Sequence, residues 1–108
     1  MFLIVSRFLI PKGYRGITIF PFVIVGDVSD REDVVMVNHE RIHIRQQLEL
    51  FILPFFIFYI VDYGIGLIRY RNRAEAYRNI SFEREAYAKE KDLHYLKSRP
   101  FWNFLKYL

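Results

Sequence analysis

Two histidines and a glutamate near the middle of the chain have a spacing that would let both histidines bind one metal ion from a single helix face. They lie in His39-Glu40-Arg41-Ile42-His43, the pattern His-Glu-x-x-His. On a helix, residues four apart share one face with Cβ atoms about 5–6 Å apart, so the two imidazoles can bind one ion at about 2.0–2.1 Å. Glu40 is turned from His39 by about 100° around the helix axis. We therefore expect Glu40 to act as general base on a zinc-bound water, with His39 and His43 as metal ligands. The plainer alternative is two surface histidines on an amphipathic helix.

A catalytic zinc site needs a third protein ligand and an open fourth position. The chain has no cysteine, so a histidine or a carboxylate must supply this ligand. His94 is expected on a helix surface. The carboxylates downstream of the motif are Asp62, Glu75, Glu83, Glu85, Glu90 and Asp92.

The two segments that contain the histidine motif and Glu83 together resemble a known class. His39-Glu40-x-x-His43 followed by Glu83-x-x-Ala86 is similar to the gluzincin arrangement of zinc metallopeptidases, a style of motif shared by integral-membrane prenyl-protein-processing proteases. The chain is also similar to short bacterial proteins with Asn-His-Glu-x-x-His and Phe-Glu-Arg-Glu-Ala-Tyr segments. This resemblance implies that Glu83 is the third zinc ligand and that the protein is a metallopeptidase. It departs at Tyr87, where the larger proteases carry an aspartate that supports a ligand histidine.

Helix geometry also favours Glu83 over Glu85. Glu83 and Glu85 are two residues apart, so their side chains lie on nearly opposite faces of a helix and cannot both point at one metal. Ala86 shares the face of Glu83, and its small size lets two helices approach closely. Glu85 is expected at the surface with Lys89 as its helical partner. The alternative is that both glutamates are solvated and the metal takes Asp62 or Glu75.

The N-terminal quarter predicts β-structure. Residues 2–10 and 16–25 are rich in Ile, Val and Phe, and a turn with proline and glycine separates them. Pro21 cannot donate to a strand ladder, so the second strand is expected to be an edge strand or to break there. An edge strand beside the metal could hold an extended peptide by main-chain pairing.

The rest of the chain predicts helices. Ser29 and Glu32 have capping-box spacing, Pro54 ends a helix, and Ser81 is a candidate internal N-cap. The expected helices are a metal helix over about 30–53, an apolar helix over about 54–70 and a third-ligand helix over about 74–98. We expect one α+β domain over residues 1–108, similar to a minimal zincin, with an N-terminal strand pair packed on three to four helices.

The composition predicts an exposed apolar surface that binds another apolar surface. Of the 108 residues 53% are hydrophobic and 19% aromatic, a large share for a small chain to bury. The stretch 50–68 is almost wholly apolar and is followed by Arg69, Arg71 and Arg73. We expect either attachment to a membrane surface, with the arginines at the headgroups, or a homodimer. The N-terminus lacks the basic region and cleavage site of a signal peptide, which predicts an intracellular, membrane-associated protein.

The sequence thus favours a zinc-dependent metallopeptidase acting on a peptide or protein. The net charge of +4 has no dense basic patch, so no nucleic-acid partner is expected. The rival is a non-catalytic, membrane-associated or dimeric interaction protein whose zinc site is structural or vestigial. Several tyrosines are candidate oxyanion donors, although each is more commonly a packing residue. They are Tyr63, Tyr70, Tyr77, Tyr87 and Tyr95.

Overall fold

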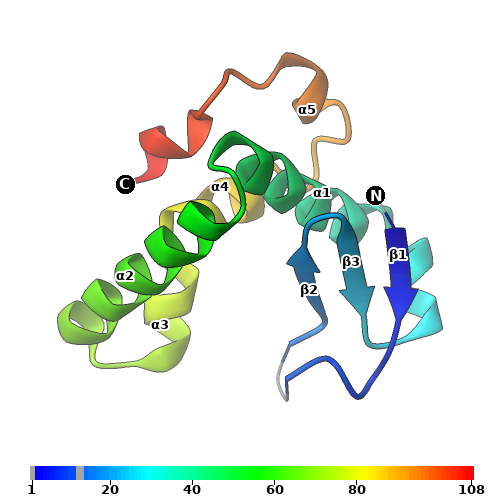
Figure 1. Ribbon diagram of the computed structural model, residues 1–108, viewed down its shortest axis with the longest axis horizontal. Coiled ribbons are helices and arrows are strands. Elements are labelled where there is room, and N and C mark those ends of the chain that lie inside the picture. The colour runs from blue at the N-terminus through cyan, green and yellow to red at the C-terminus, as the bar shows by residue number, and fades with distance from the viewer. Residues whose placement is uncertain (1, 12–13) are drawn as a thin grey trace.

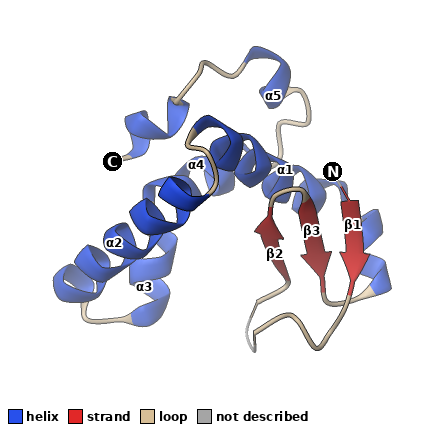
Figure 2. Ribbon diagram, viewed as in Figure 1, coloured by secondary structure: helices blue, strands red, loops and turns tan. Residues whose placement is uncertain are grey.

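The fold is α+β, which confirms the predicted class. The computed structural model describes residues 2–11 and 14–108. A small sheet and a short 3-10 helix pack against one side of the helix Val34–Glu49 (α1), and the later helices gather at its other side (Figures 1 and 2). The strands are β1 (Phe2–Val5), β2 (Gly16–Ile19) and β3 (Phe22–Val25). The helices are η1 (Val28–Glu32), α1 (Val34–Glu49), α2 (Leu53–Tyr70), α3 (Arg73–Arg78), α4 (Ser81–Lys89), α5 (Tyr95–Ser98) and η2 (Asn103–Tyr107).

The sheet has three strands, in the order β1-β3-β2, and not the predicted pair. The segment 16–25 folds on itself as the antiparallel hairpin of β2 and β3, with Pro21 in the turn. β1 pairs in parallel with β3 and ends at Val5 instead of near residue 10. Of the two alternatives predicted for residues 16–25, the break at Pro21 is the one observed: the first half, β2, lies at the margin of the sheet, and the second half, β3, is the central strand. β2 contacts α1, the helix that carries the histidines.

Helix α1 is shorter than predicted at both ends. Asp33 is the N-cap, since its carboxylate accepts the backbone N–H groups of Val35 and Met36 at 3.1 Å. The expected start near residue 30 is wrong, because residues 28–32 form a separate 3-10 turn capped by Asp27. At the other end the chain turns sharply through Phe51 and Ile52, which both have positive φ. Pro54 then stands in the first turn of α2, where its missing N–H costs no hydrogen bond.

The predicted third-ligand helix is broken into three helices. Asn72 caps α3 by accepting the N–H of Glu75 at 3.0 Å. Ser81 is not an N-cap: it is the first residue of α4, after Ile80, and its N–H donates to the Asp62 carboxylate of α2 at 2.7 Å. The chain leaves helical geometry after Lys89, so residues 90–94 separate α4 from α5. The number of helices therefore exceeds the three to four that we expected.

Three small apolar clusters hold α1 between the sheet and α4. One joins α2, α4 and η2, a second joins the sheet to α1, and a third joins α1, α4 and α5. Their fully or nearly buried members are Phe55, Ile80, Phe82 and Phe104 in the first, Val23, Val25 and Met36 in the second, and Ile42, Ala86 and Tyr95 in the third. Ala86 thus lies where α1 and α4 approach each other, as its small size predicts.

Candidate metal centre

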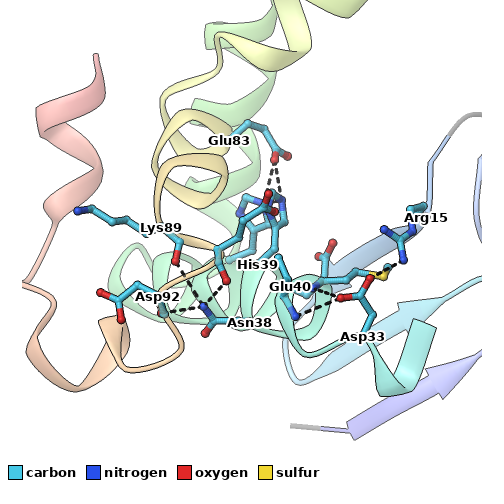
Figure 3. A network of polar contacts seen from close by, with 12 residues as sticks. Arg15, Asp33, Asn38, His39, Glu40, Glu83, Lys89 and Asp92 are labelled. Atoms are coloured by element: carbon cyan, nitrogen blue, oxygen red, sulfur yellow. Dashed lines mark hydrogen bonds and ion pairs between the residues drawn. The ribbon is translucent and has the colours of Figure 1, made fainter. Parts of the chain in front are cut away.

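His39, His43 and Glu83 form a buried group that could hold a metal ion. The histidines come from one face of α1 and the glutamate from α4, which crosses above them (Figure 3). Nε2 of His39 and Nε2 of His43 are 3.2 Å apart, and they lie 3.2 and 3.0 Å from Oε1 of Glu83. Two ligands of a tetrahedral ion with bonds of about 2.0–2.1 Å are separated by about 3.3 Å. The triangle of donor atoms therefore has the size that such an ion requires.

The outer nitrogens of both imidazoles are held by side-chain oxygens. Nδ1 of His39 is 2.9 Å from the carboxylate of Glu90, which can only accept a hydrogen bond when ionised. Nδ1 of His43 is 2.8 Å from Oε1 of Gln46. Because Nδ1 of each ring donates its proton to these oxygens, Nε2 of each neutral ring carries a lone pair. Both lone pairs point to the centre of the triangle formed by the two Nε2 atoms and Oε1 of Glu83. Such supporting contacts orient a metal-binding histidine and set its tautomer.

The centre of this group attracts a cation. Three lone-pair atoms face one another there, so either a proton or a metal must lie between them. Burial disfavours the protonated form of His43, but the charge and hydrogen bond of Glu83 outweigh burial and raise the pKa of His43 to about 9. Burial alone would raise the pKa of Glu83, yet the charge of His43 and the two histidine hydrogen bonds hold it well below its usual range.

The second oxygen of Glu83 is bound by a tyrosine that the sequence did not single out. The Tyr59 hydroxyl donates to Oε2 of Glu83 at 2.6 Å. Burial, and next the charge of Glu83, raise the pKa of Tyr59 above its ordinary value, so the phenol stays protonated. Oε1 is thereby left to face the histidines. The signal in the sequence was slight: Tyr59 is the one hydroxyl within the uninterrupted apolar run from Leu50 to Val61.

Glu40 is buried beside the group but bonds to the sheet. Its carboxylate accepts a short hydrogen bond from the Thr18 hydroxyl of β2. Gly16 stands next to it, where a Cβ atom would come within 3.2 Å of Oε1 of Glu40 and 2.8 Å of the Met36 side chain. A glycine therefore permits the close approach of the β2 backbone to α1. Glu40 lies apart from the ligand triangle, which agrees with the face predicted for it.

A cavity of about 340 Å³ lies between β2 and α2 and reaches the group. His43, Glu83 and Glu40 contribute to its polar end, and aromatic side chains of α2 and α3 form its wall. The residues that line it include Gly16, Ile17, Thr18, Phe55, Phe56, Tyr59, Tyr63 and Tyr77. A small ligand, or part of a chain, can therefore reach His43 and Glu83 from the side of the β2 edge.

Of the five tyrosines named as oxyanion donors, two line this cavity. Burial, and after it the charge of Glu83, raise the pKa of Tyr77 above its usual range, so its hydroxyl is a donor. Tyr63 is the second residue on the wall. Tyr87 packs edge-on against the His39 ring, with centroids 4.6 Å apart. The other two lie elsewhere: Tyr95 donates to Glu85, and Tyr70 is exposed at the end of α2.

The alternative ligands lie away from the histidines. Asp62 accepts the N–H of Ser81, and Glu75 is exposed on α3. His94 is exposed before α5 and is not part of the metal-binding group, as expected.

The surface role predicted for Glu85 is wrong. Its side chain is fully buried and accepts hydrogen bonds from Arg99 at 2.5 and 3.0 Å, from Tyr95 at 2.5 Å and from Gln46 at 2.8 Å. Lys89 instead lies over the Tyr95 ring. Glu85 does point away from the metal group, as its position two residues after Glu83 predicted. The C-terminal segment covers that side of α4, and this long-range contact is what buries Glu85.

Two further supporting residues were not assigned from the sequence. Glu90 lies beside His39, with its carboxylate 2.9 Å from Nδ1 of the ring. The Asn38 side chain donates to the backbone carbonyls of Glu90 at 2.9 Å and Asp92 at 3.0 Å, which ties the end of α4 to α1 (Figure 3). Asn38 therefore helps to hold Glu90 against His39. Its position immediately before the motif was the only signal in the sequence.

Comparison with family models, with curated proteins and with solved structures finds no significant match for this chain. The arrangement of His39, His43 and Glu83 is therefore the principal structural ground for assigning a function.

Proposed function

We propose that this protein is a zinc-dependent hydrolase, and specifically a metallopeptidase. The observation that carries the proposal is the triangle of His39 Nε2, His43 Nε2 and Glu83 Oε1, with edges of 3.0–3.2 Å. Two imidazoles and one carboxylate, without cysteine, are the ligand set of catalytic rather than structural zinc sites. When bound, zinc polarises a substrate carbonyl and lowers the pKa of a coordinated water toward about 7.

In this proposal the chain's own groups have separate roles. His39, His43 and Glu83 hold the metal, and Glu40 takes the proton from the attacking water and passes it to the leaving group. Thr18 holds the Glu40 carboxylate in place through its hydroxyl. Tyr77, on the cavity wall, is the donor placed to bind the oxyanion that forms on the substrate.

The outer edge of β2, up to the point where Gln47 binds the Thr18 carbonyl and the Phe20 N–H, supports a peptide as the substrate. Ile17 and Ile24 are directly opposite in the hairpin, and the carbonyl of Thr18 turns away from β3 to accept from Gln47 at 2.6 Å. Because alternate residues of a strand face the same neighbour, the N–H groups of Gly16 and Thr18 also face the free edge. Both residues line the cavity next to Glu40. An extended peptide could pair there with its carbonyl carbon near the metal group.

The test has two stages, and both use the full chain without a metal-affinity tag. Elemental analysis should find about one zinc per chain, and His39→Ala, His43→Ala or Glu83→Ala should lose it. Glu40→Gln, which keeps the shape of the side chain, should retain zinc and lose hydrolysis of a peptide library. If Glu40→Gln also emptied the site, the general-base role would be wrong. Zinc without turnover on any peptide would favour the non-catalytic alternative with a structural or vestigial site.

A further inference from the structure

One side of α2 is an exposed apolar surface, which we call the outer face. It consists of Leu53, Ile57, Ile60, Val61, Ile65 and Ile68, whose exposed fractions range from 54% to 81%. Their spacing follows the helix repeat, so they form one stripe along the 18-residue helix, about 27 Å long. Among the described residues α2 is the one helix long and apolar enough to cross a membrane, although only 11% of it is buried. Exposed apolar surfaces of this extent mark interaction sites.

The polar features of α2 are turned to its other side. Asp62 is the one charged residue between positions 53 and 68, and its carboxylate binds the N–H of Ser81. Tyr59 and Tyr63 line the cavity at the metal group. Gly66 packs against α3, where a Cβ atom would lie 3.0 Å from Cα of Ala76. Asp62 lines a groove with Ile57, Val61 and Ile65, so its hydrogen-bonded carboxylate is the one charge beside the outer face between positions 53 and 68.

Positive charge is concentrated at the C-terminal end of the outer face. Arg69 and Arg71 are exposed there, and neither of them makes an ion pair within residues 2–11 and 14–108. Arg73, the first residue of α3, instead lines a cavity with Asp33, Glu40 and Glu90. At the other end of α2, Phe51 is 84% exposed. These features suit the surface of a bilayer with anionic headgroups. The apolar stripe and the exposed aromatic residue suit the acyl boundary, and the unpaired arginines suit the headgroups.

We propose that the outer face of α2 binds the surface of a membrane that contains anionic lipid, with the helix lying in the plane of the interface. The isoleucine side chains enter the acyl boundary, and Arg69 and Arg71 contact the headgroups. The helix does not span the bilayer in this arrangement, because α3 runs beside α2 in Figure 1 and would carry exposed charges such as Glu75 and Arg78 into the hydrocarbon. The cavity lies on the opposite side of α2 and stays open to the solvent side.

Co-sedimentation with vesicles tests this proposal directly. The full-length protein should pellet with vesicles of phosphatidylcholine and phosphatidylserine in about a two-to-one ratio. Binding to phosphatidylcholine alone should be at least about tenfold weaker, and added salt should weaken binding to the anionic vesicles. A protein that stays in the supernatant with both vesicles overturns the proposal.

Substitutions separate the two parts of the surface. Ile57→Gln, Ile60→Gln and Ile68→Gln combined should reduce vesicle binding about a hundredfold or more. Arg69→Gln and Arg71→Gln combined should reduce binding to anionic vesicles by about fivefold per arginine, with little effect on phosphatidylcholine. All five sites are exposed, so the helical content by circular dichroism should not change.

Matched controls use exposed residues away from α2. Val28→Gln with Val34→Gln controls for lost apolar surface, and Arg31→Gln with Lys91→Gln controls for net charge. Equal losses in the control variants would overturn the specific role of the outer face. So would a lipid-free dimer that the isoleucine substitutions convert to a monomer, because a second copy would then cover this face.

Discussion

The side-chain oxygen of Gln46 lies 2.8 Å from Nδ1 of His43, one turn further along α1. The amide nitrogen of Gln46 is held on its other side by Oε1 of Glu85 at 2.8 Å and by the Phe82 carbonyl at 3.2 Å. Because both of these partners accept, the Gln46 amide cannot flip without losing two hydrogen bonds. The tautomer of His43 is therefore determined from α4, through Gln46.

Replacing Gln46 should weaken metal binding. In Gln46→Leu the His43 ring loses its partner, so zinc affinity should fall by about 10–100-fold in a competition titration with a chelator. Gln47→Leu is the matched control, since Gln47 is equally buried but bonds to Thr18 and Phe20 of the hairpin. Both variants should lose stability. Equal zinc affinity in the two variants would show that Gln46 does not position His43.

Glu83→Ala and Glu85→Ala should have different effects, the first on zinc affinity and the second on stability. Glu83→Ala removes a donor atom and should lower zinc affinity by more than about a hundredfold. Glu85→Ala leaves the buried Arg99 with only Glu49, at 2.6 Å, and should cost about 3–5 kcal/mol of unfolding free energy in urea. If Glu85→Ala released zinc while Glu83→Ala retained it, the assignment of the third ligand would be wrong.

The stability of the metal-free protein should depend on pH through His43. In the folded state the pKa of His43 is raised from 6.5 to about 9. Burial, the largest single effect, would lower this pKa, but the charge of Glu83 and the hydrogen bonds of the ring outweigh burial. The folded state thus holds the proton more tightly than the unfolded chain does. This contribution is complete below pH 6.5 and is lost as pH rises through about 9, so stability should fall over that window.

Zinc should abolish this pH dependence, because the metal replaces the proton between the lone pairs. Urea unfolding with and without a chelator, across that window, measures the effect. His43→Asn should flatten the metal-free curve, whereas the exposed His94→Gln should leave it unchanged. A metal-free protein whose stability rises from pH 6.5 to 9 would contradict the pKa shift of His43.

The two glycines of α2 should respond oppositely to alanine. At Gly64 a Cβ atom meets nothing within 4 Å, so Gly64→Ala should stabilise the helix by about 0.5–1 kcal/mol. At Gly66 a Cβ atom would lie 3.0–3.3 Å from the backbone and Cβ of Ala76, so α3 would have to move away. Gly66→Ala should therefore be less stable than Gly64→Ala in thermal unfolding. Equal gains would show that α2 and α3 are not closely packed there.

The features that the sequence by itself determined are those with local causes. The spacing of His39 and His43 makes them neighbours on any helix, and the same periodicity separates Glu83 from Glu85. The α+β class, the break of the second predicted strand at Pro21 and the apolar helix that becomes α2 also follow from short-range composition. Their boundaries shifted by a few residues where a specific cap, such as Asp33 for α1, competed with the predicted one.

Only the tertiary structure decided which side chains support the site and which are buried. Tyr59 and Glu90 reach Glu83 and His39 from elements far away along the chain, with 24 and 51 positions between the partners. Glu85 looked like a surface residue because its environment comes from Arg99, fourteen positions later and beyond the end of its own helix. Hydrogen bonds and ion pairs of this kind depend on distance in space. A helix repeat, which relates only residues within a turn or two, does not contain that information.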